Sequence, residues 1–138
     1  MPRFMMLMYP NVTEEQYEEG VRAEDAGAMS KFNQTLIQAG VLLALDGLHP
    51  ASKGARVTLA SGKTTITDGP FTEAKELVGG YWLIDVTSKD EAVEWASRAP
   101  LEHGTIEVRR IAEGSDYGPE IEAASRLSSA PPEQTVAE

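Results

Sequence analysis

Cysteine is missing from this chain of 138 residues, which excludes disulfide bonds and catalysis by a thiol. Its absence fits a reducing compartment, so we expect a cytoplasmic protein. Long hydrophobic runs are missing too, since no window approaches the roughly 18 apolar residues that a membrane helix needs. The apolar stretch at residues 1–9 is short and has neither a useful basic start nor a small-residue cleavage site. It therefore predicts a first strand rather than a signal peptide.

Basic side chains are scarce: 12 lysines and arginines face 22 acidic residues, and the net charge is −10. Such a chain has no electrostatic footprint for nucleic acid or for an anionic membrane, and neither is expected as a partner. The acidic surface favours solubility and is compatible with a basic protein partner. A hydrophobic content of 41% and this length predict one globular domain with a real core.

Cofactor and metal signatures are also lacking. The chain has two histidines without close carboxylate spacing, so a tetrahedral metal site would need ligands from distant loops. It contains no Gly-x-Gly-x-x-Gly or Walker sequence for a nucleotide, and no Gly-x-Ser-x-Gly nucleophile elbow. We therefore expect neither metal nor cofactor, and any chemistry would rest on acid–base side chains.

The hydrophobic pattern predicts strands at residues 4–9, 41–45, 56–60, 63–67, 81–86 and 105–111. Helices are expected after the capping sequences that start at Thr13 and Ser88, with stops at Gly40 and Pro100. This order of two βαβ-like halves around a hairpin predicts an α+β fold, a ferredoxin-like antiparallel sheet with helices on one face. The other face needs cover, which a homodimer through that open face would supply most simply.

Several finer expectations concern packing. Gly20 and Gly27 weaken the first helix and leave its boundaries or a kink open. After about Gly114 the pattern fails, so the domain is assigned to residues 1–114 and a partly ordered acidic tail to 115–138, with a short helix over 120–127. The apolar stripe of the first helix is expected to comprise Tyr17, Val21, Ala28, Phe32, Leu36 and Ala39.

Residues 68–76 read Asp-Gly-Pro-Phe-Thr-Glu-Ala-Lys-Glu and combine a turn, an aromatic anchor and four ionisable side chains. Gly69 precedes a proline and is pushed to extended or special backbone values, Pro70 fixes φ, and Phe71 is expected to be buried. Two interpretations stay open. The segment is either a rigid linker stabilised by local caps and ion pairs, or its rigidity holds Asp68 at a cleft.

These residues resemble the DGPF family, also called YCII-related proteins. The resemblance covers most of residues 3–111 and includes the Gly-Gly-Tyr strand start at 79–81, the helix sequence at 91–96 and the Val-Arg ending at 108–109. It implies a dimeric α+β barrel. The family has no established general activity, and many members look like uncharacterised bacterial proteins, some encoded beside or joined to extracytoplasmic-function sigma factors. Some superfamily relatives are enzymes, including one that dechlorinates a chlorinated hydroxyhydroquinone, so the fold permits chemistry without assigning it here.

The resemblance also implies a histidine and an aspartate in a cleft, and the matching candidates are His49 and Asp68. In such a pair the carboxylate orients the imidazole, which moves a proton to or from a substrate. The plainer alternative makes His49 a loop residue before Pro50 and Asp68 a cap of its own turn. Further candidates for substrate binding are Tyr9, Glu73, Lys75, Glu76 and Tyr81, for which a solvated turn or simple packing is the competing interpretation.

Three functional hypotheses follow. The first is a small-molecule site in which His49 and Asp68 assist a lyase, isomerase or hydrolytic step. The second is a binding or regulatory module without turnover, linked to sigma-factor control. The third is a structural dimer in which the motif serves folding alone.

Overall fold

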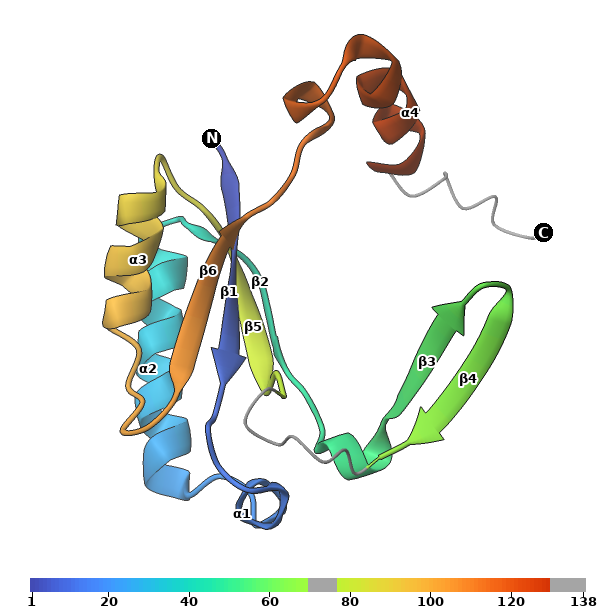
Figure 1. Ribbon diagram of the computed structural model, residues 1–138. Helices are drawn as coiled ribbons and strands as arrows, with labels where there is room; N and C mark the ends of the chain where they lie inside the picture. Colours follow the sequence, from blue (N-terminus) through green and yellow to red (C-terminus); the bar gives the residue numbers. More distant parts are fainter. Residues whose placement is uncertain (70–76, 130–138) are drawn as a thin grey trace, which may run out of the picture.

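In the computed structural model, four strands form one antiparallel sheet in the order β2-β5-β1-β6 (Figure 1). The structure describes residues 1–69 and 77–129. β1 (Arg3–Tyr9) and β5 (Gly80–Asp85) lie in the middle, with β2 (Leu42–Gly47) and β6 (Thr105–Arg110) at the edges. Each βαβ half skips one strand, β5 in the first and β1 in the second. The predicted α+β, ferredoxin-like arrangement is thus confirmed.

Two helices, α2 (Ala23–Gln38) and α3 (Lys89–Ser97), cover one face of this sheet (Figure 1). Side chains alternate along β1 and β5, so every second one points toward the helices. The ring of Phe32 on α2 meets Trp82 on β5 edge to face, with centroids 5.7 Å apart. The buried core consists of Phe4, Met6, Phe32, Leu36, Val41, Trp82, Ile84, Val86 and Ala92.

The predicted first helix is in fact two helices. α1 (Glu14–Glu18) starts at Thr13, whose side chain accepts from the Gln16 amide while the Gln16 side chain accepts from the Thr13 amide. This confirms the predicted capping box. Gly20 then takes a φ of 85°, and α2 begins anew at Ala23. A left-handed residue cannot continue an α-helix, so the chain changes direction here.

The predicted apolar stripe is wrong at both ends, and this break explains its N-terminal end. Val21 lies between the helices with 75% of its surface exposed, and Tyr17 belongs to α1 rather than to the helix that covers the sheet. Ala28 and Ala39 are exposed as well. Within α2 the stripe narrows to the buried side chains of Phe32 and Leu36.

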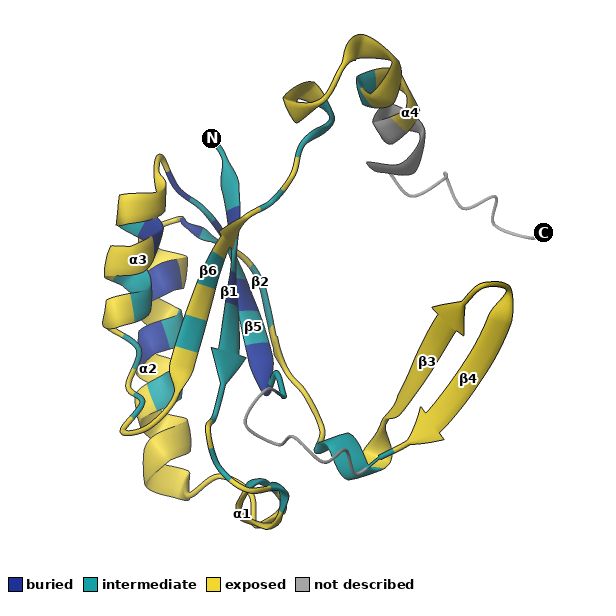
Figure 2. Ribbon diagram, viewed as in Figure 1, coloured by how far each residue is buried: buried dark blue, intermediate teal, exposed yellow. Residues whose placement is uncertain are grey.

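A separate two-stranded sheet is formed by β3 (Ala55–Ala60) and β4 (Lys63–Asp68). Its turn residues Ser61 and Gly62 have φ values of 49° and 79°, as in a type I′ turn, so the predicted hairpin is confirmed. Every residue of both strands is exposed. The hairpin stands off the face of the main sheet that the helices leave open (Figure 2).

The chain ends its described course with a short 3-10 helix η3 (Gly114–Asp116) and α4 (Pro119–Ser129), which confirms a helix in the predicted region. Arg3 Nε donates to Glu113 Oε1 at 3.0 Å and ties the start of this segment to β1. α4 lies on the same side of the sheet as the hairpin (Figure 1). Among the described helices, none is both long enough and apolar enough to cross a bilayer.

Candidate functional site

A cavity of about 310 Å³ lies at the end of the sheet where β1 finishes and β5 begins. Its walls come from Pro10 and Val12 after β1, from α1, from residues 48–54 after β2, and from residues 77–79 before β5. The third wall contains the short 3-10 helix η1 (Ala51–Lys53). Four chain segments thus converge on one largely apolar hollow, the usual form of a small-molecule site.

Tyr17 holds three of these walls together. Its hydroxyl lies against the backbone carbonyls of Leu48 and Gly79, the latter at 3.1 Å, and the Leu48 amide donates to the same Gly79 oxygen at 2.9 Å. Burial raises the pKa of Tyr17, and the charge of Glu14 raises it further. The phenol is therefore kept in the protonated form that donates a hydrogen bond.

Gly79 allows the Tyr17 ring to come this close. A Cβ at this position would lie 3.1 Å from Met8 Cε, 3.1 Å from Pro10 Cδ and 3.3 Å from Tyr17 Cε2. Gly80 is equally constrained, since its Cβ would lie 2.8 Å from the Asp46 carbonyl oxygen. The Gly-Gly pair that begins β5 is therefore required by close approach rather than by flexibility.

The wall formed by η1 is fixed to α1 through Ser52. Its amide donates to Glu14 Oε1 at 2.9 Å, and its hydroxyl donates to Glu18 Oε1 at 2.6 Å. Glu14 and Lys53 both line the cavity and supply one charge of each sign. The cavity thus combines an apolar lining with a few polar groups, and hydrogen bonds fix its walls to one another.

His49 lines this cavity, and its catalytic role, which the family resemblance implied, stays a prediction. Its neighbour Leu48 is held by Tyr17 and by the Gly79 carbonyl, and Pro50 follows at the start of η1. The imidazole itself is exposed and makes no hydrogen bond or ion pair with any residue that the structure describes. It is therefore available to a ligand.

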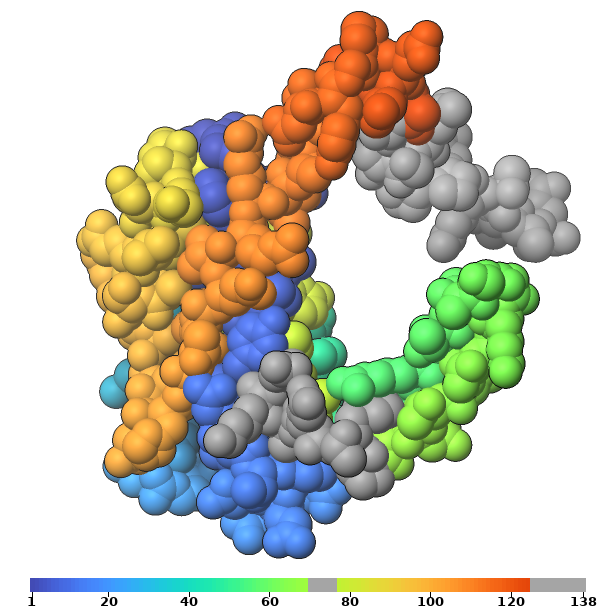
Figure 3. Space-filling model, viewed as in Figure 1, coloured from blue at the N-terminus to red at the C-terminus, as the bar shows by residue number. Residues whose placement is uncertain are grey.

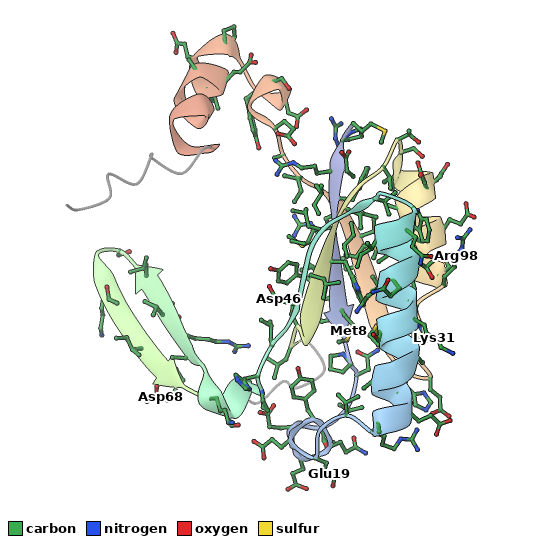
Figure 4. The ribbon with its side chains drawn as sticks, turned by 180° about the vertical axis from the view of Figure 1, so that it is seen from behind. Met8, Glu19, Lys31, Asp46, Asp68 and Arg98 are labelled. Atoms are coloured by element: carbon green, nitrogen blue, oxygen red, sulfur yellow. The ribbon has the colours of Figure 1, made fainter. Side chains whose placement is uncertain are left out.

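Asp68 lies at the last position of β4, opposite Ala55, and is exposed (Figure 4). It is not among the residues that line the cavity, and within residues 1–69 and 77–129 no hydrogen bond joins it to His49. The pairing of these two side chains stays a prediction.

The residue after Asp68 does reach the wall of the cavity. The Gly69 amide donates to the Gly54 carbonyl at 3.0 Å, and a Cβ on Gly69 would lie 1.8 Å from the Ala51 carbonyl oxygen. The start of the motif is therefore packed directly on η1. The glycine serves this close contact, in addition to the turn that the sequence suggested.

The two tyrosines proposed for substrate binding lie on the open face of the sheet, away from the cavity lining. Tyr9 donates to Glu107 Oε2 at 3.3 Å, and Tyr81 donates to Asp46 Oδ2 at 3.1 Å. The hydrogen bond to Asp46 and the charge of that carboxylate raise the pKa of Tyr81. The remaining candidates lie outside the described residues, namely Glu73, Lys75 and Glu76, as do Pro70, Phe71 and Thr72.

Sequence reasoning missed Tyr17, Glu14 and Lys53. A signal was present for the first two: a capping box directly after the Pro-Asn break places a helix start at the end of β1, and Gly20 separates that turn from the core helix. Lys53 carried no signal, because a loop lysine is ordinarily solvated. Among the described residues, no group of three or more acidic or histidine side chains could hold a metal ion.

Two comparisons with known proteins bear on this site. The model of the YCII-related domain matches residues 2–115, a span that contains every described wall of the cavity. An uncharacterised protein of Rhizobium meliloti (strain 1021) is 37% identical over 87 residues, which cover 61% of this chain and 70% of that protein.

Proposed function

Because the chain belongs to the YCII-related family, whose domain spans all the described cavity walls, we propose that the cavity is a small-molecule site with His49 as its acid–base group. One observation carries the proposal: an imidazole without a described protein partner borders a largely apolar cavity whose walls are joined by hydrogen bonds. A histidine in such a place can act as a general acid or a general base.

The lining indicates the class of ligand. Glu14 already accepts a hydrogen bond from the Ser52 amide, whereas Lys53 offers its charge at the same wall. A small, mainly apolar molecule with one anionic or hydrogen-bonding group matches this arrangement. Proton transfer by His49 would suit a lyase, isomerase or hydrolytic step, with Asp68 orienting the imidazole. The packing of Gly69 on Ala51 supports that role, because it holds the residue next to Asp68 beside the same wall.

The open face of the sheet supports a homodimer. It carries Met5, Leu7 and Leu83 on the side away from the helices. On the same face Asp85 Oδ1 is buried and has no hydrogen-bond partner among the described residues, although buried carboxylate oxygens normally have one. A second copy against this face would cover the apolar side chains and could supply the missing donor.

A second candidate function is binding without turnover, including the regulatory role beside a sigma factor. Exposed apolar side chains in the C-terminal segment favour it, since Tyr117 and Ile121 each expose 54% of their surface. A stoichiometric protein partner that is lost on deletion of residues 118–138 would support this role. Equal binding without those residues would remove the segment from it.

The test uses the two histidines as reporters, because His103 is an exposed loop residue outside the cavity lining. A fragment library is screened by NMR for compounds that shift the His49 ring signals and leave those of His103 unchanged. We expect such fragments to be small acids, and we expect His49→Ala to abolish conversion of any that react. In Asp68→Asn the tautomer ratio of His49 should change while that of His103 does not.

Two results of the screen would contradict a site in the cavity: fragments that shift the ring signals of His49 and His103 equally, and a library in which no fragment shifts either ring. Selective binding with no turnover would retain the site and favour the non-catalytic alternative. An unchanged tautomer ratio in Asp68→Asn would remove Asp68 from the site and leave His49 in place.

A further inference from the structure

The hairpin β3–β4 has one apolar face, and that face is exposed to solvent. Val57 lies directly opposite Ile66, and Leu59 shares their side of the ribbon. These side chains expose 61%, 69% and 77% of their surfaces, respectively. The opposite side of the ribbon is polar and carries Thr58 and Thr65 as a directly facing pair.

An isolated two-stranded hairpin is marginally stable in water, and its strand edges invite further pairing. In this chain the described attachment of the hairpin to the body is at its base, where Gly69 packs against the Ala51 carbonyl of η1. Apolar side chains at the far end of such a ribbon stabilise it only when another surface covers them and removes them from water.

The open face of the main sheet is a second uncovered apolar surface, and it lies on the same side of the molecule. Figure 3 shows an open gap between this side of the body and the hairpin. The two surfaces of one chain therefore do not cover each other. A two-fold axis relates every surface of one copy to the same surface of the other. A single dimer can therefore cover the apolar face of each hairpin and the open face of each main sheet.

Charge favours the same partner. Residues 55–68 contain two basic side chains, Arg56 and Lys63, and one acidic side chain, Asp68, which gives a net charge of +1. The chain as a whole carries −10, so the acidic body of a second copy attracts the ribbon by overall charge. Arg56 and Lys63 lie on the polar side of the ribbon, so they border the apolar contact rather than enter it, and Asp68 lies on the apolar side.

We propose that the hairpin is an arm that crosses to a second copy of the chain and packs Val57, Leu59 and Ile66 against that copy's body, beside the contact between the open sheet faces. The inference rests on the proposed dimer and adds to it the arm contact. The base of the arm packs on η1, which lines the cavity. A partner that holds the arm therefore also affects the position of this cavity wall.

The first test is a matched pair of substitutions in adjacent residues of β3. Leu59→Glu and Thr58→Glu add the same charge at exposed positions but on opposite faces of the ribbon. Sedimentation equilibrium should show a dimer dissociation constant at least about 10-fold higher for Leu59→Glu, as expected when a buried apolar contact is lost. Thr58→Glu should stay within about 3-fold of the unsubstituted protein. Equal effects of the two changes would overturn the arm contact.

The second test separates the arm from the sheet contact. The chain has no cysteine, so Thr65→Cys places a single spin label on the polar side of the arm. Labelled protein without isotope is mixed with ¹⁵N-enriched, unlabelled protein, and only contacts between copies then broaden the ¹⁵N signals. We expect broadening of amides in the partner's main sheet. A dimer without such broadening overturns the arm and retains the sheet-face dimer, whereas a monomer at all concentrations overturns both.

Discussion

Gly69 shows how one residue connects the motif to the cavity. Its missing side chain lets the backbone after β4 pack on Ala51, where a Cβ would lie 1.8 Å from the carbonyl oxygen. The sequence predicted a turn at this glycine. It could not predict the contact with Ala51, because that contact joins residues from two different connections whose approach is set by the whole fold.

Gly69→Ala should lower the free energy of unfolding by about 1–3 kcal/mol, since the added methyl group forces backbone apart. Gly27→Ala is the matched control. Gly27 lies inside α2 with no atom within 4 Å of a new Cβ, so the same change there should stabilise the protein by about 0.5–1 kcal/mol. Urea denaturation measures both. A Gly69→Ala protein as stable as the unsubstituted one would refute the close contact.

Tyr17→Phe tests the phenol that joins the cavity walls. The substitution removes the donor to the Leu48 carbonyl, and we expect unfolding to cost about 1 kcal/mol less at neutral pH. The raised pKa of Tyr17 means that the folded state holds the proton more tightly than the unfolded state, whose ordinary value is 10.0. Stability from this group is therefore complete below about pH 10 and is lost as pH rises through the folded-state value.

The unfolding free energy of Tyr17→Phe should accordingly fall less steeply above pH 10 than that of the unsubstituted protein. Tyr117→Phe is the control, because Tyr117 exposes 54% of its surface outside the cavity. Identical alkaline slopes for the unsubstituted protein and Tyr17→Phe would show that the phenol does not couple to folding.

At the scale of elements, α3 depends on the cap at its start. Ser88 Oγ accepts from the Glu91 amide at 3.2 Å, and the Glu91 carboxylate accepts from the Thr87 amide and hydroxyl. The sequence predicted a capping box here. The structure contains the predicted bond from the Glu91 amide to the Ser88 side chain, but the Glu91 carboxylate accepts from the Thr87 amide instead of the Ser88 amide. The spacing of residue types does not reveal this shift by one residue.

Ser88→Ala should lower the free energy of unfolding by about 1 kcal/mol, because an N-terminal amide of α3 loses its acceptor. Ser97→Ala is the matched control at the other end of the helix. The Ser97 hydroxyl donates to the Val93 carbonyl, so its loss leaves no helix amide without an acceptor and should change stability by less than about 0.5 kcal/mol. Thermal unfolding of the two variants measures both changes. Equal losses of stability in Ser88→Ala and Ser97→Ala would show that the Ser88 cap does not stabilise α3.

Glu91 adds a dependence on acid. Its hydrogen bonds to Thr87 lower its pKa below the ordinary 4.5, so the stability that they provide is present above that value and is lost as pH falls through the folded-state pKa. Glu91→Gln should therefore show a flatter decline of unfolding free energy on acidification. A decline identical to that of the unsubstituted protein would separate Glu91 from acid stability.

The elements also show where pattern reasoning ends. The hydrophobic pattern predicted strands where β1 and β5 lie, and the Ser-Gly pair predicted the hairpin turn. The helical stripe failed where Gly20 takes a positive φ, since a repeat of apolar residues continues through a break in the backbone. Alternation also assigns an apolar face to β3–β4 without saying what covers it, because that depends on contacts far away in the sequence or in another chain.

For the whole molecule, the arrangement joins the proposed dimer to the candidate site. η1 lines the cavity on one side and supports the base of the arm on the other, and Ser52 fixes it to α1. If the partner holds the arm, it also restricts the position of this wall. A ligand that binds the restricted wall more tightly must then strengthen the dimer by the same factor, because coupling between two sites is reciprocal.

A fragment that shifts His49 should therefore bind more weakly to Leu59→Glu than to Thr58→Glu, although neither residue lines the cavity. Couplings of about 1–3 kcal/mol correspond to roughly 5- to 150-fold changes in affinity, so a difference of several-fold in the dissociation constant is expected. NMR titration of His49 at two protein concentrations measures it, with tighter binding at the higher concentration for the unsubstituted protein. If Leu59→Glu forms monomers yet binds the fragment with unchanged affinity, the cavity is complete within one chain, and the arm serves assembly alone.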